Sequence, residues 1–297
     1  MLIRFIAHAG IYIEEQGYSI LLDPWFFDST LDRPIIESIG GGFKTIDFQI
    51  PQSTDSPDRY APDAIFISHF HLHHAPARDI RALCENSLSK GKKITIFYPN
   101  PNAVMEENIR AKLPAGVERT AAEAGNTFSI GPFVIEAKQH TVPYHLAWHI
   151  ASPSGSVLHI ADAKFNKDHF VRRPDPTWEK LKDFAPSFII MSAGGHSQRV
   201  ENSNGRSIKP AGIFTPMEAA EIVQMIAPKA VSLMGIYNHS IWKNRYEYIQ
   251  PAALCEEEFQ WAVSWLAPHT KHIRLTPGFT LGIGEKHLST ICDAYVQ

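Results

Sequence analysis

Short apolar runs, most of them ended by a turn or a polar residue, alternate with helical patterns along this chain. Residues 2–7, 10–15 and 18–23 predict a β-meander whose last strand stops at a proline. Later runs predict strands at 64–68, 94–98, 126–130, 132–139, 145–152, 155–160, 187–191 and 231–234, and two short strands near the end. Amphipathic or capped segments predict helices at 75–89, 102–113, 216–226 and 252–266.

The order of these elements indicates the fold class. Strands followed by alternating strands and helices occur twice, which predicts two β-rich halves with helices outside. We therefore expect an α/β (α+β) fold, a four-layer αββα sandwich forming a single domain over 1–297. Residues 25–62 are rich in glycine, proline and aspartate and only weakly periodic. Long loops in compact domains are usually functional, so we interpret 25–62 as a substrate-shaping loop, with a surface excursion as the alternative.

Composition narrows the classes of partner. The net charge is −3 and lysine and arginine form no stripe, so a nucleic-acid partner is not expected. No apolar run approaches the length of a membrane span. Three cysteines that are far apart in the sequence favour a reducing compartment over a disulfide framework. We expect a cytoplasmic protein with a small-molecule substrate, and homo-oligomerisation is left open.

A cluster of histidines is the strongest chemical signal in the sequence. His69, His71, His73 and His74 directly follow the apolar run 64–68, so four imidazoles lie at the C-terminal end of a predicted buried strand. Open α/β sheets bind ligands at this end of their strands, and neutral imidazole is the commonest metal ligand. The cluster therefore predicts a metal site rather than a solvated histidine-rich loop.

Three further candidate ligands lie downstream. His140 follows the predicted strand 132–139, Asp162 follows the strand 155–160, and His239 follows the last of the buried runs after a short loop. A lone histidine after a strand is more often structural than functional. Three such residues in order, all downstream of the cluster, favour one shared metal centre.

With these positions the chain resembles the metallo-β-lactamase fold superfamily of metallohydrolases. The family has an H-x-H-x-D-H motif and then a histidine, an aspartate and a histidine, which match in order His69, His71, His74, His140, Asp162 and His239. The segments 7–10 and 21–25 are similar to the branch that contains ascorbate-phosphate lactonase-like enzymes, N-acyl-phosphatidylethanolamine phospholipase D and CMP-sialic acid hydroxylase. The resemblance covers nearly the whole chain and implies a sandwich of the metallo-β-lactamase type.

The resemblance also implies two divalent metal ions, with zinc expected first and iron or manganese as alternatives. It makes Asp162 a ligand that bridges the two ions. The ligands it assigns to the first ion are His69, His71 and His140, and those it assigns to the second ion are His74 and His239. Two ions about 3.5–4 Å apart can share a water and lower its pKa. A metal-bound hydroxide would then attack a small ester, phosphodiester, lactone or amide.

One position departs from the family pattern. His73 stands where the family has an aspartate that binds the second metal. An imidazole can replace it as a ligand, since histidine suits zinc, iron, copper and nickel. Alternatively, the longer ring does not fit and the second ion is weakly held or absent. We keep His73 as a candidate metal ligand.

Other side chains are candidates for roles around the ions. Asp23, a carboxylate at a strand end, is the best candidate to orient a ligating imidazole through its other nitrogen. His196 lies in a glycine-rich loop after a buried strand and is a candidate substrate contact or proton donor. With Asp162, these two form the candidate catalytic set. His145 and His149 alternate along a strand, where a polar strand explains them as well as a site does.

Three functions are compatible with the sequence. The first is a metal-dependent hydrolase of the kind just described. The second is a di-iron oxygenase, because some relatives hold two irons in this fold; it would need a separate reductase, since no cysteine–histidine motif for an iron–sulfur cluster is present. The third is a non-catalytic metal-binding protein in which His73 marks a degenerate second site.

Overall fold

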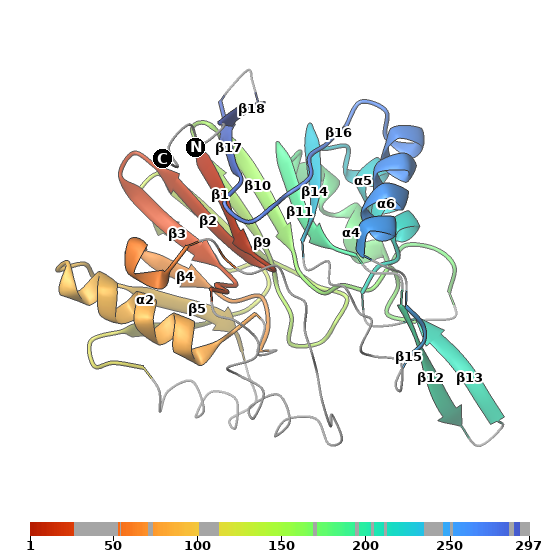
Figure 1. Ribbon diagram of the computed structural model, residues 1–297, viewed down its shortest axis with the longest axis horizontal. Helices are drawn as coiled ribbons and strands as arrows, with labels where there is room; N and C mark the ends of the chain where they lie inside the picture. Colours follow the sequence, from red (N-terminus) through yellow and green to blue (C-terminus); the bar gives the residue numbers. More distant parts are fainter. Residues whose placement is uncertain are drawn as a thin grey trace.

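Two β-sheets face each other across the centre of the molecule, and helices cover the outer face of each sheet (Figure 1). The computed structural model describes residues 1–26, 53, 55–70, 74–100, 113–168, 171–193, 196–202, 205–210, 213–234, 246–249, 252–284 and 288–291. Both ends of the described chain contribute to one sheet, because β17 pairs with β1. No helix in these ranges is long and apolar enough to span a membrane.

The first sheet comes mainly from the N-terminal part of the chain and has the order β18-β17-β1-β2-β3-β4-β5-β6. The predicted meander is confirmed as β1 (Leu2–Ala7), β2 (Gly10–Glu15) and β3 (Tyr18–Leu22). The remaining strands are β4 (Ala64–Phe66), β5 (Thr95–Pro99), β6 (Glu118–Ala122), β17 (Thr280–Ile283) and β18 (Leu288–Ile291). Strands β3 to β6 run parallel to one another. Their carboxyl ends therefore meet at one edge of the sheet.

The second sheet has the order β16-β14-β11-β10-β9-β8-β7. Its strands are β7 (Thr127–Ile130), β8 (Phe133–Lys138), β9 (Ala147–Ser152), β10 (Gly155–Ile160), β11 (Phe188–Ser192), β14 (Ala230–Met234) and β16 (Lys271–His272). β10, β11, β14 and β16 are parallel, and every residue of β11 and β14 is buried. Continuous apolar strands of this kind are typical of parallel sheets covered on both faces.

Three apolar clusters separate the layers. One lies between the sheets and includes Phe66 and Trp148. A second packs the second sheet against α4 (Pro176–Glu179), α5 (Pro216–Ile226) and α6 (Ala252–Leu266). A third packs the first sheet against α2 (Ala77–Ser89). The predicted four-layer αββα sandwich is confirmed.

The helix starts follow local sequence signals. α5 begins with the predicted capping box, in which Thr215 accepts from the Glu218 backbone N–H and the Glu218 side chain accepts from the Thr215 N–H. Asp175 is the N-cap of α4, and its side chain accepts from the Thr177 N–H. The predicted helix at 102–113 lies outside the described residues except for its last residue.

A small third sheet was not predicted from the sequence. It has the order β13-β12-β15 and consists of β12 (His196–Asn202), β13 (Gly205–Pro210) and β15 (Tyr246–Ile249). Figure 1 shows this sheet extending away from the two main sheets. Most of the predicted substrate-shaping loop 25–62 lies outside the described residues; its described part includes a 3-10 turn, η2 (Pro57–Arg59). A similar turn, η3 (Lys182–Phe184), follows α4.

The described end of that loop is tied to β1 by a buried carboxylate. Asp55 accepts from Arg4 Nε at 2.8 Å and from the Tyr60 hydroxyl at 2.5 Å, and it also pairs with Arg59. Burial alone would raise the pKa of Asp55, but the hydrogen bonds from Arg4 and Tyr60 hold it below its usual range. The ionised carboxylate therefore anchors the chain just before β4.

We expect Asp55→Asn to lower the free energy of unfolding by about 2 kcal/mol near pH 7, because it removes the charge from a buried hydrogen-bonded pair. The folded-state pKa lies below the unfolded value, so this stabilisation is present above about pH 4 and is lost at lower pH. Urea unfolding of wild type and variant across that range measures it. Asp58→Asn, at an exposed neighbour, is the control; equal stability of both variants at pH 7 would contradict the anchor.

Candidate metal centre

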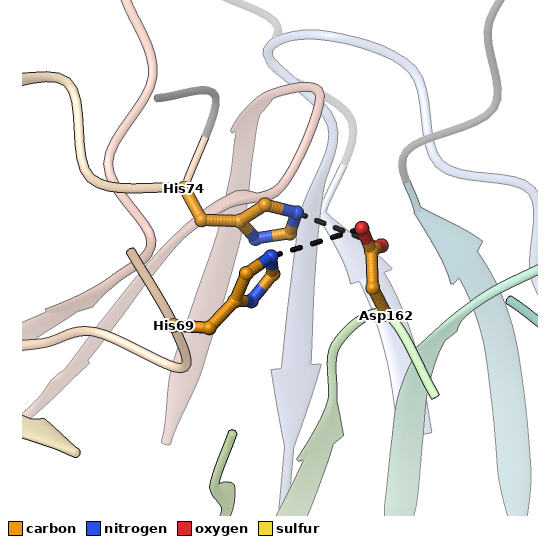
Figure 2. A group of neighbouring side chains, drawn as sticks. All are labelled: His69, His74 and Asp162. Carbon is orange, nitrogen blue, oxygen red and sulfur yellow. Dashed lines mark ion pairs between the residues drawn. The ribbon is translucent and has the colours of Figure 1, made fainter. Parts of the chain in front are cut away.

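The carboxyl ends of strands from both sheets meet at one group of polar side chains. His69 and His74 follow β4 of the first sheet, and Asp162 follows β10 of the second sheet. One ligand atom from each lies within 4.8 Å of the others. Figure 2 shows both imidazoles pointing toward the Asp162 carboxylate from the opposite side. Three predicted metal ligands are thus brought together across the sandwich.

A buried carboxylate fixes the orientation of both rings. Asp23, at the end of β3, accepts from the Ser68 N–H at 2.7 Å, from the Ser68 hydroxyl at 2.6 Å and from His74 Nδ1 at 2.8 Å. Because the Ser68 hydroxyl donates its only proton to Asp23, its Oγ must accept a hydrogen bond from His69 Nδ1, which lies 3.0 Å away. Both rings therefore carry a proton on Nδ1.

The Nε2 atoms of both rings face the Asp162 carboxylate. His69 Nε2 lies 3.7 Å from Asp162 Oδ2, and His74 Nε2 lies 3.6 Å from Asp162 Oδ1. These distances are too long for hydrogen bonds, although both rings are buried. Two lone-pair donors and an anion around one small space are the donor set that a divalent cation requires. The three side chains fit a metal ion, with each carboxylate oxygen directed to a different imidazole.

The electrostatics of His74 support the same conclusion. Burial alone lowers the pKa of this ring, but Asp23 and Asp162 together raise it to about 9. Burial likewise disfavours the charged form of Asp23, yet the His74 ring holds the pKa of Asp23 below its usual range. A cation at His74 Nε2 is thus favoured by two carboxylates, and a metal ion would replace the proton there.

Further polar residues support this centre and were not assigned to it from the sequence. Ser192, the last residue of β11, donates its hydroxyl to Asp162 Oδ1 at 3.0 Å. His159 is fully buried in β10, with Nε2 3.7 Å from Asp23 Oδ2. Burial lowers the pKa of His159 to about 4, so the ring is neutral at pH 7. Of these contacts, only that of Ser68 has a local sequence signal, because this serine directly precedes His69 at the end of a strand.

The segment between β8 and β9 brings two more imidazoles to the same edge. His145 stacks on His69 with ring centres 4.0 Å apart, and His140 lies 5.3 Å from His145. His149, one of the two alternating histidines, instead lies against Phe184, with ring centres 5.2 Å apart. Of the pair that the sequence left open, His145 is the one that contacts a candidate ligand.

Several predicted site residues cannot be placed in this group. His71, His73 and His239 lie outside the described residues. His196 begins β12 and pairs with Ile249 of β15, which places its backbone in the small third sheet. Roles for these four side chains stay predictions.

Comparison with solved structures identifies the fold. The metallo-β-lactamase fold protein YhfI from Bacillus subtilis has a TM-score of 0.57, with 15% identity over 92% of this chain and 90% of that one. The chain has the metallo-β-lactamase fold. Isothiocyanate hydrolase from Delia radicum gut bacteria has a TM-score of 0.62, with 14% identity over 96% of this chain and 100% of the other.

The same fold also occurs in a redox enzyme. CmlA, a diiron β-hydroxylase from Streptomyces venezuelae, has a TM-score of 0.60 and 14% identity. The similarity covers 98% of this chain but 54% of CmlA. The sequence itself matches no family model and no curated protein. At these identities the likeness shows the fold.

We expect Asp23→Asn to weaken metal binding by about 10- to 100-fold, because a neutral amide cannot hold both Nδ1 protons in place through His74 and Ser68. Competition with a chromogenic chelator measures the affinity. Asp55→Asn, which removes a buried carboxylate elsewhere, controls for general destabilisation. Unchanged affinity in Asp23→Asn would show that the carboxylate does not orient the ligands.

Proposed function

We propose that this protein is a metal-dependent hydrolase that acts on a small ester, phosphodiester, lactone or amide. The observation that carries this proposal is the convergence of His69, His74 and Asp162, whose ligand atoms lie within 4.8 Å of one another, with both Nε2 atoms facing the carboxylate. Both imidazoles already carry their protons on the nitrogens that face away from Asp162. Such preorganisation, with acceptors behind each ring, is characteristic of metal-binding histidines.

The chain's own residues have distinct tasks in this reaction. When bound, the ions would supply a water of lowered pKa and positive charge for the oxygen that becomes anionic. His69 and His74 hold the ions, while Asp23 and Ser68 keep both rings in the ligating tautomer. Asp162 is partly exposed and receives a hydrogen bond from Ser192 on Oδ1. Its Oδ2 faces His69 Nε2 and would be the ligand oxygen on that side of the site.

Two features support hydrolysis of a small molecule. Hydrolases are among the proteins with this fold, including the isothiocyanate hydrolase and the metallo hydrolase Igni18. The chain carries a net charge of −3, which does not favour a nucleic-acid polyanion. A di-iron oxygenase is the second candidate, because CmlA shares the fold.

We expect protein purified without added metal to contain about two zinc or manganese ions per chain and to hydrolyse activated esters or phosphodiesters. Asp162→Asn removes the carboxylate charge and is expected to lose bound metal and about 100-fold or more in kcat/KM. Asp168→Asn, at an exposed position nearby in the sequence, is the control. Elemental analysis and initial rates give the two readouts.

The outcomes separate the candidate functions. Bound zinc or manganese with turnover supports the hydrolase. Bound iron together with oxygen consumption, and no hydrolysis, supports the oxygenase instead. Tight binding of a single ion without turnover indicates a non-catalytic metal protein, and absence of bound metal after reconstitution contradicts all three.

The departure at His73 gives a separate prediction. If His73 binds the second ion, His73→Ala loses about one ion per chain, whereas His73→Asp, which restores the family's residue, keeps the wild-type metal content. Elemental analysis of the three proteins after identical dialysis tests this. Equal metal content in all three would remove His73 from the site.

A further inference from the structure

A histidine of β10 interrupts the apolar layer between the two sheets. Val157 and Ala161, two residues before and after His159, belong to that layer, so His159 lies on the same face of the strand. Its partners across the neighbouring strands, Trp148 and Ile190, are also part of the layer. The ring is fully buried. A polar ring at such a position costs free energy unless it acts on another polar group.

Asp23 is the polar group that this ring faces. His159 Nε2 lies 3.7 Å from Asp23 Oδ2, and no other carboxylate of the described residues lies as close to the ring. Neither ring nitrogen has a hydrogen-bond partner in the described part of the chain. Because burial lowers the pKa of His159 to about 4, the ring is neutral at pH 7 and carries one N–H. The negative charge of Asp23 favours this proton on Nε2, where the N–H dipole faces the carboxylate at more than hydrogen-bond distance.

Asp23 depends on its surroundings for its orientation. Its φ is 41°, in the left-handed region that few non-glycine residues adopt. Such conformations persist where surrounding contacts impose them, and they are frequent at functional sites. Ser68 and His74 contact the carboxylate from the segment that follows β4 of the first sheet. His159 contacts the same carboxylate from the second sheet.

This contact closes a circuit of polar groups across the sandwich. Asp162 follows His159 by three residues, just after the end of β10. Its Oδ1 lies 3.6 Å from His74 Nε2, and His74 Nδ1 lies 2.8 Å from Asp23 Oδ2. From Asp23 the circuit returns to β10 through His159. The spacing between the Asp162 carboxylate on one sheet and the imidazoles on the other therefore depends on how His159 fits against Asp23.

We propose that His159 is a positioning residue of the metal centre, which holds the Asp23 carboxylate from the second sheet through its Nε2–H. The inference rests on the metal centre proposed above. His159 does not bind an ion in this proposal. It acts through Asp23 on the orientation of His74 and on the distance that separates His74 from Asp162. The alternative is a ring that only fills space between the sheets.

Three substitutions of His159 separate these two roles. His159→Phe fills nearly the same volume and removes both nitrogens. His159→Gln places an amide N–H close to the position of Nε2, whereas His159→Asn places one close to Nδ1 and ends short of Asp23. The two amide variants bury the same polar group and differ in reach. The matched control is His149→Phe, because His149 is a buried histidine of the neighbouring strand β9 that lies against Phe184.

We expect His159→Phe and His159→Asn to weaken zinc binding by about 10-fold, and His159→Gln to stay within about 3-fold of wild type. His149→Phe should keep the wild-type affinity. In the Asp23→Asn background, His159→Phe should have no further effect, because substitutions that act through one group are not additive. Competition with a chromogenic chelator measures the affinity, and thermal unfolding of the metal-free proteins checks that each variant has folded.

A second readout uses the metal-free protein. The proton on His74 Nδ1 is hydrogen-bonded to Asp23 and should give a low-field NMR signal, which isotope labelling of histidine assigns. We expect this signal to stay at its wild-type position in His159→Gln and in His149→Phe. It should shift or broaden in His159→Phe and His159→Asn, because the carboxylate has lost its contact from the second sheet.

Other results overturn the inference. Wild-type zinc affinity in His159→Phe would make the ring a space-filling residue, and equal losses in His159→Phe and His159→Gln would exclude the Nε2 contact. A further loss in the Asp23→Asn background, or an equal loss in His149→Phe, would also contradict it. If wild type binds no metal, the proposed function fails, and the His74 signal still decides this inference: an unchanged signal in His159→Phe overturns it.

Discussion

The buried carboxylate of Asp23 is the interaction on which the site depends. A fully buried anion must receive hydrogen bonds, and Asp23 obtains them from the Ser68 backbone, the Ser68 hydroxyl and the His74 ring. These donors belong to the same short segment that follows β4. Satisfying one buried charge thus aligns β3 with the loop after β4, and it determines which nitrogen of His69 and His74 faces Asp162.

The negative charges of two carboxylates favour a cation at this centre. Two carboxylates, Asp23 and Asp162, lie on opposite sides of His74, and the ring responds with a pKa raised to about 9 despite its burial. A proton can satisfy His74, but the second imidazole and the second oxygen of Asp162 would still face each other at 3.7 Å. Divalent ions between the rings and the carboxylate can satisfy both oxygens and both rings. The ligand geometry is therefore better matched to metal than to a proton.

Much of the fold and the core of the site could be predicted from the sequence. Continuous apolar runs indicated the buried strands, and polar residues at their ends indicated the shared edge, because parallel strands of a sheet end together. The hairpin of β12 and β13 was not predicted, since its polar sequence carries no alternation and its pairing with β15 is long-range. Ser192 and His159 were also missed, because their contacts depend on neighbouring strands that are distant in sequence.

The order of ligands along a chain fixes a metal site only to within the length of a loop. Both His140 and His145 lie between the end of β8 and the start of β9, so either could occupy the same place in the family pattern. What distinguishes them is the partner of Nδ1: a backbone N–H leaves the proton on Nε2, and a carbonyl leaves the lone pair there. In this chain, the strands bring the polar segments to one edge, while backbone groups of the loops orient the individual side chains.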